Sequence, residues 1–353
     1  MQIFEQMMRR SHEQVVYCNE ESAGLRAIIA IHDTTLGPAL GGVRMYPYAT
    51  EEDALLDVLR LSKGMTYKAS VAGLNLGGGK AVIIADPRKD KNEVLLRAFG
   101  RFVETLGGRY ITAEDVGTNV ADMEYVLAET SHVVGISVTQ GGSGDPSPVT
   151  AYGVWKGIQA TAHAKFGRDD LEGLRIAIQG LGKVGYHLAR HLVQSGAQVT
   201  ACDIDAARAK AVGEELGIEI VAPETIFDVP CDIFSPCAMG GVINDETLER
   251  LQCAAIAGAA NNQIAEERHG RLLEEKGILY APDFVINAGG LINVYCEMDG
   301  YNRDRALRMC DTIYDKLLEV FRIAASDDAL TTHDAAQLAA RRRIEAVRRL
   351  RSL

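Results

Sequence analysis

Short apolar runs alternate with amphipathic patterns along the chain, which is typical of an α/β protein. In the first half we expect strands at 25–32, 80–87 and 109–118 and helices at 51–65 and 92–108. From residue 174 onward strands and helices alternate regularly, and each expected strand is a continuous apolar run. Such strands are buried on both faces, so the second half predicts a parallel sheet covered by helices.

The length and the turn composition predict two domains. A chain of 353 residues exceeds the size at which a single core usually stops growing. The richest Gly/Ser/Pro cluster, "GGSGDPSP", covers residues 141–148 and marks the expected boundary. We therefore expect one α/β domain over residues 1–147, joined by a C-terminal helix at 331–353, and a second domain over 148–330.

Composition and charge limit the class of partner. A net charge of -11 argues against a nucleic-acid surface, and the arginine-rich tail at 339–352 predicts a solvated or oligomer-facing helix. No apolar run approaches the roughly 18 residues of a membrane span, and the first twenty residues lack the order of a secretion signal. Seven cysteines show no zinc-binding spacing. We expect a cytoplasmic protein with no metal and no membrane partner.

The stretch "QGLGKVGYHLARHL" carries a dinucleotide-binding pattern between a strand and a helix. Gly180, Gly182 and Gly185 complete GxGxxG, which suits a tight turn, close approach of a pyrophosphate and close helix packing. Asp203 ends the next strand, where a carboxylate accepts hydrogen bonds from the ribose of NAD and repels the phosphate of NADP. Asp205 could share this role, and Arg208 could receive a phosphate instead. The pattern predicts a Rossmann-type NAD-binding domain.

Two lysines and an acidic pair mark a second candidate site in the first half. Lys80 follows three glycines and precedes an apolar strand, so it lies on a rigid support; we expect the glycines to leave space for a ligand against the backbone. A lysine in a buried cleft has a lowered pKa and can act as an acid or base. Lys68 is suited to anchoring a carboxylate. Glu114 and Asp115 end a strand, where active-site groups of open α/β sheets gather.

Six stretches resemble one known family over nearly the whole chain. They are "TTLGPALGGVRM", "LSKGMTYKASVAGLNLGGGKAVI", "YITAEDVGT", "GSGDPSPVTAYGV", "GAANNQ" and "YAPDFVINAGGLINV". They are similar to the glutamate/leucine/phenylalanine/valine family of amino acid dehydrogenases, and most to its members that act on leucine. The resemblance implies a Rossmann-type NAD-binding domain, an N-terminal α/β domain for substrate binding and oligomerisation, and an even-numbered homo-oligomer, an octamer or a dimer.

The resemblance also implies the roles of individual residues. Lys80 would be the catalytic lysine, Asp115 would move protons, and Lys68 and Asn287 would hold the substrate carboxylate. Asn261 or Asn262 would contact the nicotinamide end of NAD. Further expected substrate contacts are Gly41, Gly42 and Met65, and the expected cofactor turn also includes Leu181, Lys183 and Val184. The implied reaction is reversible oxidative deamination of an amino acid to a 2-oxo acid and ammonia.

The expected side-chain pocket is apolar. In glutamate-specific members the residue before the two glycines is a lysine, whereas this chain has Leu40 there. The positions that match the pocket of leucine-specific members are Leu40, Ala113, Leu291 and Val294. A glutamate carboxylate would be unpaired among them, so we expect a branched-chain aliphatic substrate: leucine, valine or isoleucine. An aromatic amino acid is the alternative, since apolar pockets separate neighbouring sizes by only about 1–3 kcal/mol. A non-catalytic NAD-binding regulator is the remaining hypothesis.

Overall fold

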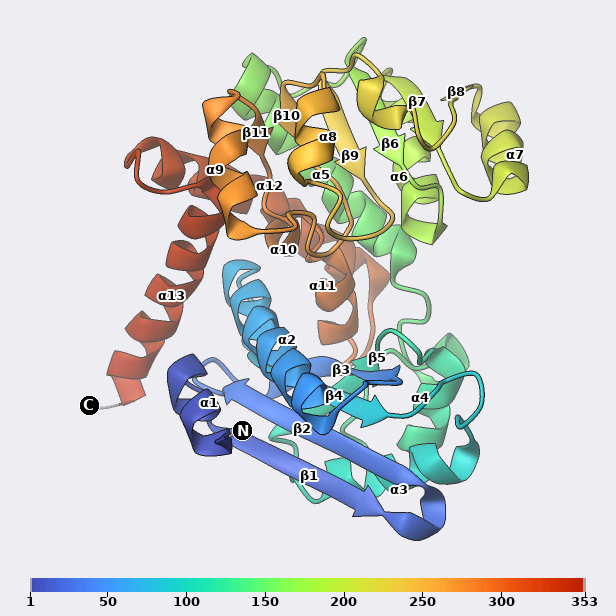
Figure 1. Cartoon of the computed structure of the whole chain (residues 1–353), viewed down its shortest axis with the longest axis vertical. Coiled ribbons are helices and arrows are strands. Elements are labelled where there is room, and N and C mark those ends of the chain that lie inside the picture. Colours follow the sequence, from blue (N-terminus) through green and yellow to red (C-terminus); the bar gives the residue numbers. More distant parts are fainter. Residues whose placement is uncertain (1, 352–353) are drawn as a thin grey trace. The chain divides into compact units, whose positions relative to one another are not determined.

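The computed structural model describes residues 2–351, which form two compact units, each built on its own β-sheet (Figure 1). The first unit contains the chain up to Asp145, the segment Val294–Arg303 and the chain from Ala340 onward. The second contains Pro146–Asn293 and Asp304–Ala339. This division places residues 294–303 with the first unit and 331–339 with the second, unlike the expected boundaries. Residue 1 and residues 352–353 of the expected first domain lie outside the described part.

The first unit is built on a five-stranded sheet with the strand order β1-β2-β4-β3-β5. β2 is antiparallel to β1 and β4, whereas β3 is parallel to β4 and β5. The strands are β1 (Gln14–Glu20), β2 (Leu25–Asp33), β3 (Ala39–Tyr46), β4 (Gly77–Ile84) and β5 (Tyr110–Glu114). The three expected strands are confirmed, but β1 and β3 were missed. β3 contains two adjacent glycines and an arginine, which interrupt the apolar pattern.

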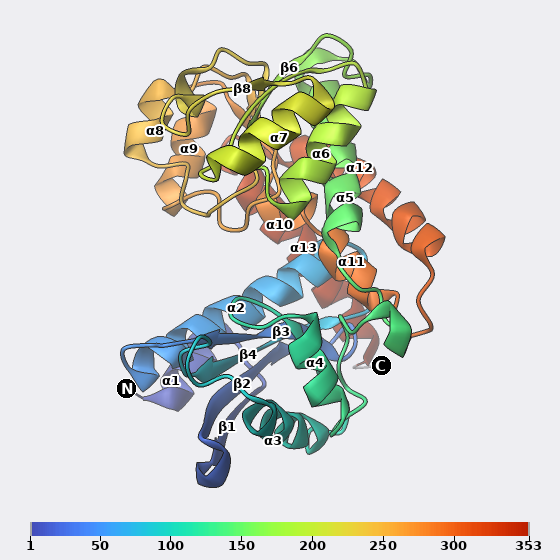
Figure 2. The same cartoon turned by 90° about the vertical axis from the view of Figure 1, so that its right-hand side faces the viewer.

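Helices cover both faces of this sheet (Figure 2). The helices of the first unit are α1 (Ile3–Arg10), α2 (Glu51–Val71), α3 (Glu93–Glu104) and α4 (Val120–Leu127). α2 begins where the Thr50 side chain accepts a hydrogen bond from Asp53 N, and three acidic residues in its first turn favour the positive end of the helix dipole. Leu55, Val58 and Leu59 of α2 pack on Ile28 and Val82, while α3 and α4 pack on the other face.

The three glycines at the start of β4 are required by packing inside the protein. A Cβ atom at Gly78 would lie 2.1 Å from the backbone nitrogen of Thr66 in α2. At Gly79 it would lie 2.6 Å from the Tyr110 ring, and at Gly77 2.1 Å from the carbonyl oxygen of Asp33. The expectation that these glycines leave space for a ligand is therefore wrong: protein atoms occupy that space. The absent side chains let helix α2, the Tyr110 ring and the end of β2 lie close to the start of β4.

The second unit is built on a six-stranded parallel sheet with the order β11-β10-β9-β6-β7-β8, as the continuous apolar runs predicted. Its strands are β6 (Arg175–Gln179), β7 (Gln198–Cys202), β8 (Glu219–Ile220), β9 (Ile233–Pro236), β10 (Ala255–Ile256) and β11 (Leu279–Tyr280). The remaining helices are α5 (Ser147–Phe166), α6 (Lys183–Gln194), α7 (Ala206–Leu216), α8 (Asp245–Arg250), α9 (Glu267–Glu275), α10 (Asp283–Ile286), α11 (Gly289–Tyr295), α12 (Arg303–Ala325) and α13 (Thr332–Arg351). The regular alternation of strands and helices expected from residue 174 onward is confirmed.

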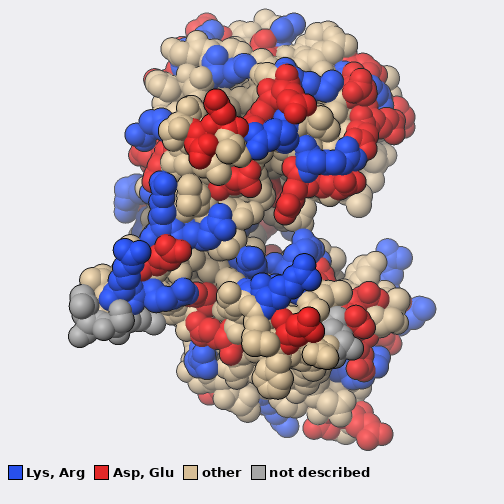
Figure 3. All heavy atoms as spheres, turned by 60° about the vertical axis from the view of Figure 1, so that its left-hand side comes forward, with Lys and Arg blue, Asp and Glu red and all other residues tan. Residues whose placement is uncertain are grey.

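Several surface and composition features are plain in the described residues. No helix among them is long and apolar enough to cross a membrane. Acidic and basic side chains are interspersed over most of the face seen in Figure 3. All seven cysteines are free thiols and five of them are buried. Within residues 2–351 no group of three or more His, Cys, Asp or Glu side chains is arranged to hold a metal ion.

Candidate active site

A buried ion pair joins Lys80 and Asp115 in the first unit. Lys80 lies on β4, Asp115 follows β5, and Lys80 Nζ is 2.9 Å from Asp115 Oδ1. Burial lowers the pKa of Lys80, and the neighbouring Asp115 carboxylate opposes this without reversing it. Burial also acts to raise the pKa of Asp115, but Lys80 and then Arg44 outweigh it and hold that pKa below its usual range. Of the two groups, only Lys80 is shifted toward its neutral form relative to the same group in water.

A second cation holds the other oxygen of the same carboxylate. Arg44 Nε donates to Asp115 Oδ2 at 2.9 Å, and Arg44 Nη1 donates to Asp57 Oδ2 of α2 at 3.0 Å. The Tyr48 hydroxyl and Arg60 also donate to Asp57. The sequence interpretation missed Arg44 and Asp57. The sequence does contain a signal for Arg44: it lies two residues after Gly42, and alternate residues of a strand point to the same face of the sheet.

The backbone turn after β5 fixes the position of Asp115. The Thr118 side-chain oxygen accepts from Asp115 N at 2.9 Å and donates to Val43 O of β3. Gly117 has φ +84, and a Cβ atom there would lie 2.1 Å from Met45 O, so glycine meets both the conformational and the packing demand. The stretch "AEDVGT" therefore presents a carboxylate from a rigid turn beside β3.

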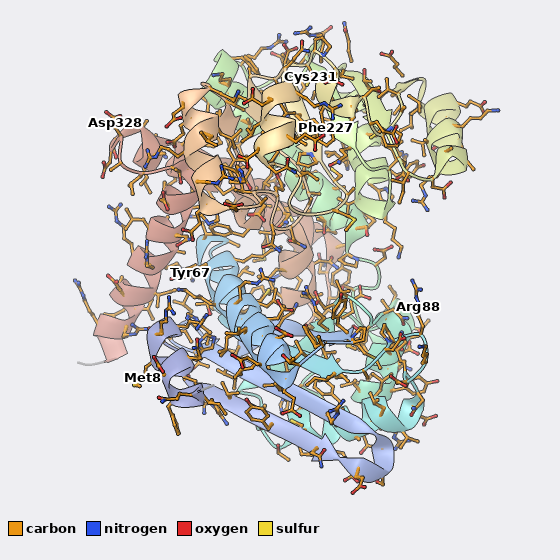
Figure 4. All side chains as sticks on the ribbon, viewed as in Figure 1. Met8, Tyr67, Arg88, Phe227, Cys231 and Asp328 are labelled. Atoms are coloured by element: carbon orange, nitrogen blue, oxygen red, sulfur yellow. The ribbon has the colours of Figure 1, made fainter. Side chains whose placement is uncertain are left out.

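Helix α2 and the two glycines of β3 lie against the same part of the sheet. A Cβ atom at Gly41 would lie 1.8 Å from Gly79 O and 3.3 Å from Met65 Cγ, and one at Gly42 would lie 2.9 Å from Asp115 Cβ. Lys68 is half-buried one turn after Met65, in the C-terminal half of α2 that Tyr67 marks in Figure 4. Gly41, Gly42 and Met65 are thus gathered beside the ion pair.

The four expected pocket residues are buried but belong to different units. Leu40, Ala113 and Val294 lie in the first unit, and Leu291 lies in the second. Leu40 is opposite Gly78 of β4, and Ala113 is opposite Gly42. The same face of the sheet also carries Lys80 and Arg44, but the position before the two glycines is occupied by the apolar Leu40.

The glycine-rich turn of the second unit has the features that a pyrophosphate requires. Gly180 has φ +100, and a Cβ atom at Gly185 would lie 2.0 Å from Gly180 O, so helix α6 packs directly on the turn. A Cβ atom at Gly182 would meet no atom within 4 Å. Gly182 is the N-cap of α6 and provides no capping side chain, and Lys183 and Val184 begin the helix. These residues fit a dinucleotide, whose phosphates would take the N–H groups of the first turn.

Asp203 ties the end of β7 to this turn. Its Oδ2 accepts from Leu181 N at 2.8 Å and its Oδ1 accepts from Asp205 N at 2.8 Å. Arg208 lies 3.5 Å from Asp203 and 3.2 Å from Asp205. Asp205 is the N-cap of α7, so its carboxylate already has a structural role. Ile204, missed in the sequence, is 93% exposed beside Asp203 and offers an apolar contact for an adenine ring.

The three asparagines expected at the site lie together in the second unit. Asn287 Nδ2 donates to Asn261 Oδ1 at 2.8 Å and to Ala259 O at 3.0 Å. Asn262 has φ +50, and its backbone nitrogen donates to the buried carboxylate of Asp283. Both N–H groups of the Asn287 amide thus have protein partners, and Asp283, which the sequence interpretation missed, supports the unusual backbone of Asn262.

Comparisons with known proteins identify the family of this chain. Residues 10–132 match the family described as "Glu/Leu/Phe/Val dehydrogenase, dimerisation domain", and residues 141–207 and 204–350 match "Glutamate/Leucine/Phenylalanine/Valine dehydrogenase". The chain therefore belongs to the glutamate/leucine/phenylalanine/valine dehydrogenase family, and it is an amino acid dehydrogenase. The expected family, fold class and enzyme class are confirmed.

Similar proteins within this family differ in the side chain of their substrates. The chain is 57% identical to a leucine dehydrogenase of Thermoactinomyces intermedius over 352 residues, which covers 100% of this chain and 96% of that protein. It is 52% identical to a phenylalanine dehydrogenase of Bacillus thermotolerans, over 98% of this chain and 91% of that protein. The crystal structure of an L-tryptophan dehydrogenase from Nostoc punctiforme superposes with a TM-score of 0.88 at 47% identity, covering 98% and 99% of the two chains.

Proposed function

We propose that the protein catalyses the reversible, NAD-dependent oxidative deamination of leucine, and of valine and isoleucine, to the 2-oxo acid, ammonia and NADH. The observation that carries this proposal is the buried pair of Lys80 and Asp115, 2.9 Å apart, in a chain that is 57% identical to a leucine dehydrogenase. Leu40 supports an uncharged substrate side chain, since an arriving carboxylate would find no cation at that position.

Lys68, Lys80 and Asp115 of the first unit have distinct tasks in this reaction. Lys68 binds the substrate carboxylate, and Asn287 would add a hydrogen bond to it by giving up its bond to Asn261 or to Ala259 O. When bound, NAD would accept the hydride from the substrate Cα. Neutral Lys80 takes a proton from the water that adds to the resulting iminium carbon, because burial favours the uncharged amine. Asp115 exchanges protons with Lys80 through the atoms that form the ion pair. Ammonia then leaves and the 2-oxo acid remains.

The cofactor is proposed from the turn between β6 and α6. The open space at Gly182, the uncapped N-terminus of α6 and the carboxylate of Asp203 suit the pyrophosphate and ribose of NAD. Leu181, Lys183, Val184 and the neighbouring glycines would hold the phosphates, and Asn261 or Asn262 would contact the nicotinamide. Asp203 would repel the 2′-phosphate of NADP, so NAD is the proposed cofactor.

The second candidate substrate and the proposed assembly rest on separate observations. An aromatic amino acid is the second candidate substrate, because the four expected pocket residues are apolar and the chain is 52% identical to a phenylalanine dehydrogenase. A cytoplasmic homo-oligomer, an octamer or a dimer, is the proposed assembly, because residues 10–132 match a domain described as a dimerisation domain. Light scattering of the purified protein tests the assembly directly.

A substrate panel tests the proposed function. Purified protein is mixed at alkaline pH with each common L-amino acid and with NAD or NADP, and the NADH absorbance is followed. Leucine with NAD should give the highest kcat/KM, and leucinamide should be a poor substrate because Lys68 has no carboxylate to bind. Lys68→Ala should chiefly raise KM for leucine. A higher kcat/KM for phenylalanine would select the aromatic alternative, and no activity with any amino acid would refute the proposal.

A further inference from the structure

Asp115 is held at both carboxylate oxygens by different cations. Lys80 lies at 2.9 Å from Oδ1, and Arg44 Nε donates to Oδ2 at 2.9 Å. Rotation of the carboxylate about its last bond would break both contacts. The arrangement therefore keeps one oxygen directed at the lysine and reserves the other for the arginine.

Arg44 is itself fixed by a second carboxylate on another element. Its Nη1 donates to Asp57 Oδ2 at 3.0 Å, so the guanidinium joins the end of β5 to helix α2. Arg44 and Asp57 side chains are 21% and 17% exposed, so water screens these contacts weakly. A planar guanidinium can span two carboxylates in this way, whereas a lysine ammonium cannot provide the same fixed fork.

We propose that Arg44 is a positioning residue of the reaction: it orients Asp115 toward Lys80 and keeps it charged, and Asp57 holds Arg44 in place. This inference rests on the proposed function of the Lys80–Asp115 pair. Arg44 does not need to touch the substrate for this role. Its effect passes through the carboxylate that exchanges protons with Lys80.

The charged groups around the Lys80–Asp115 pair determine the direction in which each substitution should shift the pKa of Lys80. Arg44 comes from β3 and Asp57 from α2, and Lys68 lies further along α2. Tyr110 of β5 packs on the opposite face of the sheet, and its hydroxyl donates to Gly41 O. The positive charge of Arg44 lowers the pKa of Lys80, and the negative charge of Asp57 raises it. Removing Arg44 should therefore raise the pH at which Lys80 becomes neutral, and removing the charge of Asp57 should lower it. A purely structural role would not produce opposite shifts.

The test compares Arg44→Gln, Arg44→Lys and Asp57→Asn with wild type. Arg97→Gln is the matched control, since Arg97 also bridges two carboxylates, Glu93 and Glu129, but contacts neither member of the pair. The first readout is the pH midpoint of the rising limb of kcat/KM for leucine oxidation. The second is the pH dependence of carbamylation of Lys80 by cyanate, measured by mass spectrometry, which requires the neutral amine but no turnover. Thermal melting confirms that each variant is folded.

The expected results differ among the variants. Arg44→Gln should move both midpoints upward by about one pH unit, and Asp57→Asn should move them downward. Arg44→Lys should keep the midpoints near wild type while kcat falls about tenfold, because charge is retained and orientation is lost. Arg97→Gln should change neither. If Arg44→Gln is unfolded, the proposal is tested by whether Asp57→Asn moves the two pH midpoints downward. Unchanged midpoints in the folded variants would overturn the proposal. Because carbamylation needs no substrate, failure of the proposed function would leave that readout intact.

Discussion

The Asp203 carboxylate accepts a hydrogen bond from Leu181 N, so the acidic residue at the end of β7 is joined to the glycine-rich turn before α6. Arg208 lies 3.5 Å from the same carboxylate. Asp203 is therefore both a candidate ribose ligand and a support of the turn that would hold the phosphates. Asp203 also forms an ion pair with the nearby Arg208 guanidinium.

Asp203→Ala should weaken the use of NAD and narrow the preference for NAD over NADP. Wild type should prefer NAD by at least about a hundredfold in kcat/KM. The 2′-phosphate of NADP would be repelled by the Asp203 carboxylate, and the hydrogen bonds that the ribose of NAD donates to this carboxylate would be lost. The variant loses that repulsion, and Arg208 becomes available for the phosphate. Steady-state kinetics with both cofactors measure the ratio.

Asp205→Ala is the control for this prediction. Its carboxylate caps α7 by accepting from Arg208 N, so its loss should lower the stability by about 1 kcal/mol and leave the cofactor ratio nearly unchanged. An unchanged NAD/NADP ratio in Asp203→Ala would show that Asp203 does not read the ribose.

Gly78→Ala should strongly destabilise the first unit. The added methyl group would lie 2.1 Å from Thr66 N and 2.5 Å from Ser62 O, so helix α2 must move away from β4. We expect a loss of about 3 kcal/mol in the free energy of unfolding, measured by urea denaturation.

Gly64→Ala is the opposite case on the same helix. Gly64 is exposed within α2 and an added Cβ would meet no atom within 4 Å, so alanine should stabilise the protein by about 0.5–1 kcal/mol. Equal effects of the two substitutions would contradict the close contact between α2 and the glycine run.

The buried histidines His12 and His32 should make the stability depend on pH. Burial lowers the pKa of His32 to about 4 and that of His12 to about 3, and the charge of His32 contributes to the latter. Below about pH 6.5 the unfolded chain binds protons that the folded chain does not, so stability is full above that pH and is lost as the pH falls toward 4. The slope should reach about 1.4 kcal/mol per pH unit for His32.

His32→Gln tests this dependence by urea unfolding at several pH values. The variant should be less stable at pH 7.5, because hydrogen bonds to Thr66 and to Arg10 O are lost. Its deficit should shrink as the pH falls from 6.5 to 5. A deficit that stays constant with pH would contradict a neutral buried His32.

The parallel sheet and the glycine-rich turn could be predicted from sequence because both depend on local patterns. Continuous apolar runs identify strands buried on both faces, and Gly180, Gly182 and Gly185 have a fixed spacing between a strand and a helix. Lys80 and Asp115 were expected from resemblance, and the structure brings them into contact.

The contacts that surround these residues could not be predicted in the same way. Arg44 and Asp57 meet only because β3 and α2 pack against each other, and no spacing in the sequence encodes that contact. The glycine run predicted space for a ligand, and only the positions of Thr66, Tyr110 and Asp33 in the fold show that close packing requires it. Strand β3 was hidden because its glycines and Arg44 serve packing and charge rather than an apolar pattern.

The turnover and NAD affinity of Lys80→Ala, measured in the same preparation, test the central claim most directly. Lys80 belongs to the first unit and the glycine-rich turn to the second, so the substitution should leave the dissociation constant for NADH, measured by fluorescence titration, within about twofold of wild type. Leucine oxidation should fall by at least about a thousandfold, since no other group would take the proton from the attacking water. Retention of a tenth of the wild-type turnover with normal NADH binding would contradict the assignment of Lys80 as the catalytic base.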